Sequence, residues 1–428
     1  MLKKIPVEDV CVGMHLHALE GAWLDHPFWR TRFTVSDPEQ LRKLRASCVR
    51  EVWIDISKGL DVQSALATEP VLAAAAPSSA PAPSPTAQVS PEGGGGRPPR
   101  AMPSGTPSAP LQSSMAEELQ RAAAICQRGR EEVASMFLEA RLGKAIDPQA
   151  CLPLVEEVSA SVLRNPGALV SLARLKTQDQ YTFMHSVAVC ALMVALAREL
   201  GFDAEACRVA GLAGLVHDLG KALMPLEVLN KPGKLTDAEF AVMRTHPERG
   251  HELLLEARGA GSAVLDVCLH HHERVDGSGY PHGLAGEAIS TLARMGAICD
   301  VYDAITSNRP YKAGWDPAES IVRMASWKGH FDPELFKAFV KSLGIYPVGS
   351  LVRLKSERLA VVVEHNPQAL TMPVVKVFFS IRSNMPVSVH RLDLTGSSDR
   401  IVGRESAAQW GFTQITSLWT EGQAPVFG

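Results

Sequence analysis

The chain has 428 residues, a formal net charge of -3 and a hydrophobic content of 46%. This length exceeds what one hydrophobic core usually holds, so two or three domains are expected. The weakly negative charge gives no basic field of the kind that a polymeric nucleic acid needs, which argues against DNA or RNA as a partner. A small anionic nucleotide remains compatible, because local basic residues decide its binding.

The distribution of cysteines and apolar residues predicts a soluble, cytoplasmic protein. The eight cysteines are scattered, and several fall within apolar helical patterns, which indicates reduced thiols rather than a disulfide framework. The first residues, MLKKIPVEDV, include lysines without an apolar stretch behind them, so we predict no signal peptide. The longest strongly apolar run, Val187 to Ala197, is about half as long as a membrane-spanning helix. We therefore expect no membrane insertion.

The N-terminal part of the chain predicts a small domain and a tether. Residues 1–66 combine short β-like runs with a helical pattern near Pro38 to Ala46, which is typical of a small α/β domain. The aromatic segment Trp23 to Trp29 could be a contact surface, although a local hydrophobic cluster is the favoured interpretation. Residues 67–113 are rich in Ala, Pro, Ser and Gly and cannot bury enough apolar surface to fold. They predict a disordered linker.

The remainder predicts a helical domain at 114–344 and a small β-rich appendage at 345–428, so the fold class is multidomain and mainly α. Alternating apolar residues predict strands from 345 to about 395, followed by an irregular tail of about thirty residues that packs back on the domain or frays. Helical periodicity predicts helices at Met115 to Ala140, Pro148 to Arg164, Ala168 to Leu175, Thr182 to Leu200, Ala204 to His217, Asp237 to Ala257, Ser262 to His271, Ile289 to Thr306 and Pro317 to Ser326.

Residues with metal-binding chemistry are concentrated in two stretches, HDLGK at 217–221 and HHERVDGSGYP at 271–281. Burying so many titratable groups requires compensation, and a metal ion is the usual one. Imidazole and carboxylate ligands suit iron, manganese or zinc, whereas the sequence contains no paired-cysteine cluster for a thiolate zinc site. The second stretch is therefore interpreted as half of a catalytic metal centre.

Other candidates for this centre each have a plainer interpretation. A single histidine on an apolar helix, such as His185, is more often a satisfied core residue than a ligand. His246 has a competitor in His251 one turn away, and a salt bridge between Asp218 and Lys221 is the alternative to a metal site.

Acidic and basic residues near 300–312 add to the pattern. Asp300 and Asp303 lie one turn apart in an otherwise apolar helix, where two acids are costly unless they meet a cation. Arg309 and Lys312 follow in SNRPYKAG and could bind a phosphate, although a solvated loop is the better interpretation of these two residues alone.

The order of these motifs carries more information than any one of them. From Asp179 to Lys312 the chain presents a His, HD, a His, HHExxDGxGYP, an Asp and RPYK, and this resembles the HD-GYP family of bacterial HD metallophosphohydrolases. Residues 1–66 are similar to a small N-terminal domain of unknown function found in a subset of that family. The resemblance implies an all-helical domain that hydrolyses cyclic di-GMP, first to linear pGpG and often to GMP.

The resemblance also implies roles for individual residues. One metal ion would be bound by His185, His217, Asp218 and Asp300, and a second by His246, His271 and His272, with Asp218 as the bridge. Lys221, Asp218 and Asp303 would act in catalysis, and Gly279, Tyr280, Arg309 and Lys312 would contact the nucleotide. The spacing to Glu273 selects His271 and His272 rather than His270 as family ligands.

The expected cofactors are two divalent metal ions. Some family members carry a Glu that supports a third metal where this chain has Tyr181. Iron or manganese is favoured over zinc, which the ligand set does not exclude. Two such ions lower the pKa of a bound water and hold a phosphoryl oxygen, so no protein nucleophile is required.

Two other functions are compatible with the sequence. The chain could be a signalling module that binds a nucleotide or a protein with little turnover, or a phosphodiesterase that acts on cyclic GMP-AMP. The sequence also leaves open a protein partner of the N-terminal domain and assembly into a homo-oligomer.

Overall fold

The structure is a computed structural model that describes residues 2–19, 33–45, 50–61, 113–175, 181–231, 233–257, 259–307, 314–412 and 415–420. The chain divides into two compact units, Met1–Met102 and Pro103–Gly428, and each is described by itself. The aromatic segment at 23–29 and residues 67–112 of the predicted linker lie outside the described residues.

The described residues of the first unit form a small antiparallel sheet and one α-helix. Its four strands are ordered β1, β4, β2, β3. Strand β1 pairs with β4 so that Ile5 lies opposite Val52, and both side chains are buried. This confirms the predicted small α/β fold. The bounds are β1 Leu2–Pro6, β2 His15–Leu19, β3 Phe33–Thr34, β4 Glu51–Asp55, the 3-10 helix η1 Val7–Asp9 and α1 Pro38–Arg45.

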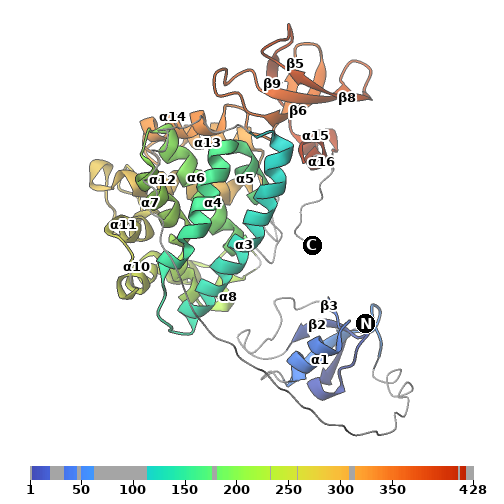
Figure 1. The fold of residues 1–428 in the computed structure, drawn as a ribbon, viewed down its shortest axis with the longest axis vertical. Coiled ribbons are helices and arrows are strands. Elements are labelled where there is room, and N and C mark those ends of the chain that lie inside the picture. Colours follow the sequence, from blue (N-terminus) through green and yellow to red (C-terminus); the bar gives the residue numbers. More distant parts are fainter. Residues whose placement is uncertain are drawn as a thin grey trace, which may run out of the picture. The chain divides into compact units, whose positions relative to one another are not determined.

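The second unit is mainly helical, as predicted, with a β-sheet at one end (Figure 1). Its α-helices before the sheet are α3 Met115–Arg141, α4 Leu152–Arg164, α5 Pro166–Ala173, α6 Tyr181–Glu199, α7 Ala204–Val216, α8 Leu226–Leu229, α9 Asp237–Met243, α10 His246–Glu256, α11 Ser262–His270, α12 Thr291–Thr306, α13 Pro317–Ser326 and α14 Pro333–Leu343. Short 3-10 helices are η3 Pro148–Cys151, η5 Leu219–Leu223 and η6 Gly286–Ala288.

Helix α6 forms the centre of the helical core and packs against α3, α4, α5, α7, α12 and α14. Close packing on α7 depends on glycine, because a Cβ at Gly211 would lie 2.9 Å from Val194 of α6. Thr182–Glu199 is long and apolar enough to cross a membrane, but 78% of this window is buried within the unit. Burial among other helices therefore accounts for its apolar character.

One predicted helix is wrong, and the difference shapes the site. The sequence predicted a single helix from Asp237 to Ala257, whereas α9 ends at Met243 and α10 begins at His246. Pro247 lies in the first turn of α10, where its missing N–H costs no helical hydrogen bond. The break places His246 at the start of a new helix rather than within a continuous one.

The C-terminal part forms a five-stranded antiparallel sheet ordered β8, β7, β6, β5, β9. The predicted irregular tail is wrong in part, because β9 pairs with β5, whereas the burial of Trp419 agrees with a tail that packs back on the domain. The bounds are β5 Leu351–Leu354, β6 Arg358–Glu364, β7 Val374–Ser380, β8 Met385–Asp393, β9 Ile401–Arg404, α15 Ala407–Trp410 and α16 Ile415–Trp419.

Candidate metal centre

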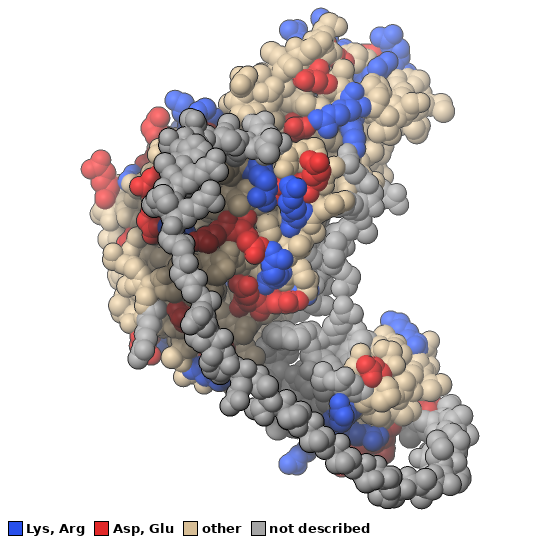
Figure 2. Space-filling view, in the orientation of Figure 1, with Lys and Arg blue, Asp and Glu red and all other residues tan. Residues whose placement is uncertain are grey.

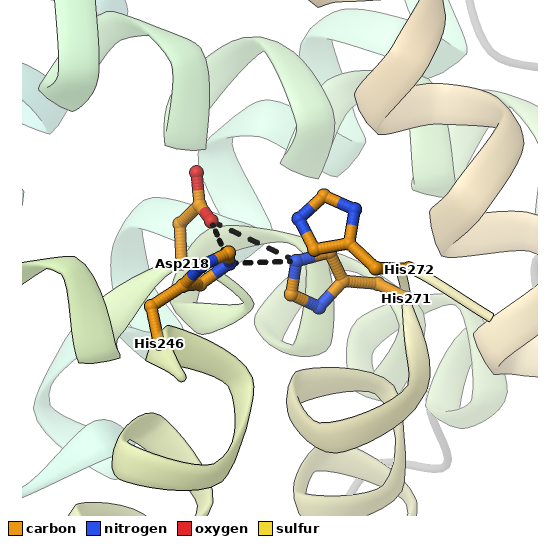
Figure 3. Close-up of side chains that lie close together, drawn as sticks. All are labelled: Asp218, His246, His271 and His272. Atoms are coloured by element: carbon orange, nitrogen blue, oxygen red, sulfur yellow. Dashed lines mark hydrogen bonds and ion pairs between the residues drawn. The ribbon is translucent and has the colours of Figure 1, made fainter. Parts of the chain in front are cut away.

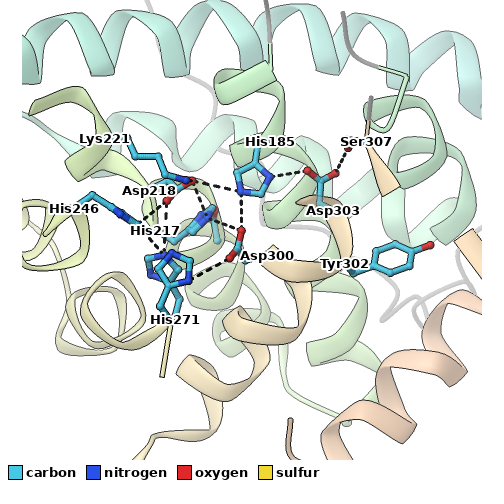
Figure 4. A network of polar contacts seen from close by, with 12 residues as sticks. His185, His217, Asp218, Lys221, His246, His271, Asp300, Tyr302, Asp303 and Ser307 are labelled. Atoms are coloured by element: carbon cyan, nitrogen blue, oxygen red, sulfur yellow. Dashed lines mark hydrogen bonds and ion pairs between the residues drawn. The ribbon is translucent and has the colours of Figure 1, made fainter. Parts of the chain in front are cut away.

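The predicted ligands come from within two helices and from the ends of three others, and they lie close together (Figure 4). His185 comes from the first half of α6 and Asp300 from α12, while the others follow or begin helices. All are buried except His272, which is half-buried. The remaining members are His217 and Asp218 after α7, His246 at the start of α10, and His271 and His272 after α11.

The side chains form two groups that could each hold a metal ion. The first contains His185, His217 and Asp300. The second contains Asp218, His246, His271 and His272 (Figure 3). Within each group the ligand-type atoms all lie within 4.8 Å of one another. The structure thus brings together every residue that the sequence predicted as a metal ligand, and it groups Asp218 with His246, His271 and His272.

Asp218 lies between the two groups. Its Oδ2 is 3.4 Å from Nε2 of His185 and 3.4 Å from Nε2 of His217. Its Oδ1 is 3.2 Å from Nε2 of His246 and 3.7 Å from Nε2 of His271. One carboxylate therefore directs an oxygen toward each group, as a bridging ligand requires.

Backbone carbonyls orient three of the imidazoles. Nδ1 of His217 donates to the carbonyl of Gly214 at 2.8 Å, and Nδ1 of His246 donates to that of Met243 at 2.8 Å. Nδ1 of His271 lies 2.9 Å from the carbonyl of Cys268. Because a carbonyl only accepts, Nδ1 carries the hydrogen and the lone pair of Nε2 faces the centre. Metal-binding histidines are held in this way.

Burial keeps most of these imidazoles neutral. It lowers the pKa of His217 to about 3 and lowers the pKa values of His246 and His272 below their usual range. Burial opposes ionisation of Asp218, but the Lys221 ammonium and nearby imidazoles hold its pKa well below the usual value. Neutral imidazole and ionised carboxylate are the metal-binding forms.

Unsatisfied polar atoms test whether these residues fit a metal ion. In the part of the chain that the structure describes, Nε2 of His217 and Oδ1 of Asp218 are buried without a hydrogen-bond partner. Leaving such atoms unpaired costs about 1–3 kcal/mol each. A divalent cation would satisfy both atoms, so the donor set fits a metal centre.

Asp303 and Lys221 occupy different positions around this centre. Asp303 lies behind His185, with Oδ2 2.6 Å from its Nδ1, and supports the ring rather than facing the ligand groups (Figure 4). Lys221 forms the salt bridge to Asp218 Oδ2 that the sequence offered as an alternative, and its side chain is 22% exposed. Both the salt bridge between Lys221 and Asp218 and the cluster of histidines are therefore present.

The segment after the two histidines forms a loop against the centre. The ring of Tyr280 stacks on His272 with centroids 4.7 Å apart. Glu273, which the sequence left without a role, is buried and accepts hydrogen bonds from the amides of His282 and Leu284 at 2.7 and 3.1 Å. A Cβ at Gly279 would lie 2.5 Å from Cα of Glu273, so close chain packing requires this glycine.

The other residues that the sequence singled out are absent from the ligand groups or lie outside the described residues. His270 contacts Asp266 at 2.8 Å and is absent from both ligand groups. His251 is half-buried on α10 and is also absent from them. Arg309 and Lys312 lie outside the described residues, as does the side chain of Tyr181.

Clustered histidines and aspartates at the ends of packed helices define a metal-dependent hydrolase of the HD class. The HD domain model matches residues 164–335, and a model of a domain of unknown function, DUF3391, matches residues 2–151. The chain is 54% identical over 425 residues to the cyclic di-GMP phosphodiesterase PA4108 of Pseudomonas aeruginosa, covering 98% of this chain and 96% of that protein.

Two further relatives match a smaller share of the chain. The cyclic di-GMP phosphodiesterase response regulator RpfG of Xanthomonas campestris is 43% identical over 34% of this chain and 39% of its own length. The 3'3'-cGAMP-specific phosphodiesterase 1 of Vibrio cholerae is 40% identical over 39% of this chain and 38% of its own length. The chain belongs to the HD-GYP family, which confirms the resemblance found in the sequence.

Proposed function

We propose that this chain is a metal-dependent phosphodiesterase that hydrolyses cyclic di-GMP to linear pGpG. The position of Asp218 between two groups of buried imidazoles carries the proposal. The relative that aligns over 98% of the chain is a cyclic di-GMP phosphodiesterase, which supports this substrate. Further hydrolysis to GMP is part of the same test.

The proposed cofactors are two divalent metal ions, iron or manganese in preference to zinc. His185, His217 and Asp300 would hold one ion, His246, His271 and His272 the other, and Asp218 both. When bound, such ions activate water and stabilise charge on a phosphoryl oxygen. Lys221, fixed by Asp218, adds a positive charge for the phosphate or the leaving oxygen.

The alternative functions have less support. The cyclic GMP-AMP enzyme aligns with 39% of the chain, whereas the cyclic di-GMP enzyme aligns with nearly all of it. A binding module with little turnover would not need a carboxylate shared between two ligand groups. Measuring the turnover of both cyclic dinucleotides distinguishes these three functions.

The rest of the domain scheme is part of the proposal. We place the metal centre in a helical domain at 114–344, joined by the 67–113 linker to a domain at 1–66 that could bind a protein partner, with an appendage at 345–428. On the face drawn in Figure 2, Lys and Arg are interspersed with Asp and Glu among the described residues.

A cytoplasmic location would match a nucleotide substrate. Cys151, Cys190, Cys207, Cys268 and Cys299 are free thiols, in keeping with a reducing compartment.

The test is product analysis. Purified full-length protein, loaded anaerobically with ferrous iron or manganese, is incubated with cyclic di-GMP, and the products are resolved by chromatography beside an Asp218→Ala variant. We expect pGpG or GMP from the intact chain alone. Turnover of cyclic GMP-AMP but not of cyclic di-GMP would assign cyclic GMP-AMP as the substrate. No turnover of either by metal-loaded protein would favour a binding module.

A further inference from the structure

An arginine without an assigned role lies beside the metal centre. The guanidinium carbon of Arg244 is 4.7 Å from the centroid of the Tyr280 ring. The same ring stacks on His272 at 4.7 Å with an interplanar angle of 29°. His272 belongs to one of the two ligand groups. One aromatic side chain thus contacts both a candidate metal ligand and the guanidinium.

The turn between α9 and α10 fixes the position of Arg244. Its amide donates to the carbonyl of Phe240 at 2.9 Å, and the Thr245 hydroxyl donates to that of Val242 at 2.8 Å. Two residues further on, Nδ1 of His246 donates to the carbonyl of Met243. Arg244 and the candidate ligand His246 therefore project from the same hydrogen-bonded turn.

The charge of Arg244 is available for an anion. Its side chain is exposed, and in the described ranges no ion pair neutralises it. Lys221, in contrast, is bound to Asp218, and Arg249 to Glu252 at 3.1 Å. Stacking on an aromatic ring attracts the guanidinium and restricts where it lies. A planar guanidinium matches two oxygens of a phosphate.

We propose that Arg244 binds the phosphodiester group of the cyclic dinucleotide that is not being hydrolysed. The inference rests on the proposed function. A cyclic dinucleotide carries two phosphodiester groups, and the metal centre takes only one of them. The other remains anionic and requires a positive charge near the centre. Arg244, held through Tyr280 next to His272, supplies that charge.

The test compares a substrate with two phosphodiester groups, cyclic di-GMP, and one with a single group, bis(4-nitrophenyl) phosphate. In Arg244→Ala we expect KM for cyclic di-GMP to rise about tenfold, as loss of one charge-assisted contact implies. We expect kcat to change less than about twofold, since the charge contacts substrate and transition state equally. Hydrolysis of bis(4-nitrophenyl) phosphate and metal content should not change. Arg244→Lys should recover part of the affinity.

The control is Arg249→Ala, which removes an exposed cation on α10 that is paired with Glu252 and should leave both substrates unaffected. An equal loss on both substrates in Arg244→Ala, or no loss on either, would overturn the proposal. Equilibrium binding of cyclic di-GMP and cyclic di-AMP completes the test. Phosphate binding predicts an equal loss of affinity for both, whereas a loss confined to cyclic di-GMP would assign Arg244 to guanine instead. If the wild type binds cyclic di-GMP without hydrolysing it, the proposed function fails while these binding measurements still decide the role of Arg244.

Discussion

Asp303 Oδ2 accepts a hydrogen bond from Nδ1 of His185 at 2.6 Å, while Nε2 of the same ring lies 2.9 Å from Asp300 Oδ1. A carboxylate behind a ligand histidine fixes the orientation of the ring and increases its basicity. The sequence placed Asp303 among the catalytic residues. Its position in the structure supports a positioning role that acts through His185.

Replacing Asp303 with Asn should therefore weaken metal binding. We expect metal affinity to fall about 10- to 100-fold, because the supporting charge is lost. Titration of the apoprotein with manganese measures the effect. Ser307→Ala, which removes a hydroxyl 3.2 Å from the other oxygen of Asp303, is the control and should have a smaller effect. Unchanged affinity in Asp303→Asn would contradict the positioning role.

Gly220 should tolerate no side chain. A Cβ there would lie 1.9 Å from the carbonyl oxygen of His246 and 2.5 Å from the amide nitrogen of Gly250. Gly220→Ala should lower the free energy of unfolding by about 3 kcal/mol and reduce activity, because η5 and α10 must separate. Urea denaturation measures this. At Gly396 a Cβ meets open space, so Gly396→Ala should be neutral, and equal effects at both glycines would refute the packing argument.

The buried carboxylate of Glu118 should make stability depend on pH. It accepts two hydrogen bonds from Arg164, both 2.8 Å long, and ties α3 to α4. Burial opposes its ionisation, but the bonds from Arg164 and Arg121 hold its pKa below the ordinary value. A lowered pKa in the folded state adds stability that is complete above the unfolded value of about 4.3. That stability is lost as pH falls through the folded value.

Glu118→Gln should consequently cost on the order of 2 kcal/mol at pH 7. The difference from wild type should shrink as pH falls below about 4, because the carboxylate of the unfolded chain then binds a proton, and it should vanish once the native carboxylate is protonated as well. Chemical denaturation across this pH range gives the result. Glu157→Gln, which removes the exposed partner of Arg128, should cost no more than about 0.5 kcal/mol. A gap that widens toward acid would show that the sign is wrong.

The sequence predicted which side chains meet because their order matches a family pattern. His217 and Asp218 are adjacent, and adjacent helical residues point about 100° apart, so periodicity alone could not show that both reach one centre. The structure resolves this by ending α7 at Val216. Pro247 in the sequence was the available indication that α9 and α10 are separate helices.

Other features depend on contacts between distant parts of the chain. Strand β9 is short and pairs with β5, so no local alternation marked it within the predicted tail. The role of Glu273 depends on the amides of residues 282 and 284, which are brought back by the loop. The contact of Arg244 with Tyr280 joins two segments that are distant in the sequence, so it could not be predicted from the sequence alone.

The central claim, a centre of two metal ions bridged by Asp218, is tested most directly by metal content. Wild type, Asp218→Ala and Asp266→Ala are loaded with manganese, desalted and measured by elemental analysis. Asp266 contacts His270 outside the ligand groups and serves as the control. We predict two ions per chain in wild type and in Asp266→Ala, and fewer than one in Asp218→Ala. One ion or none in wild type, or two in Asp218→Ala, would contradict the account.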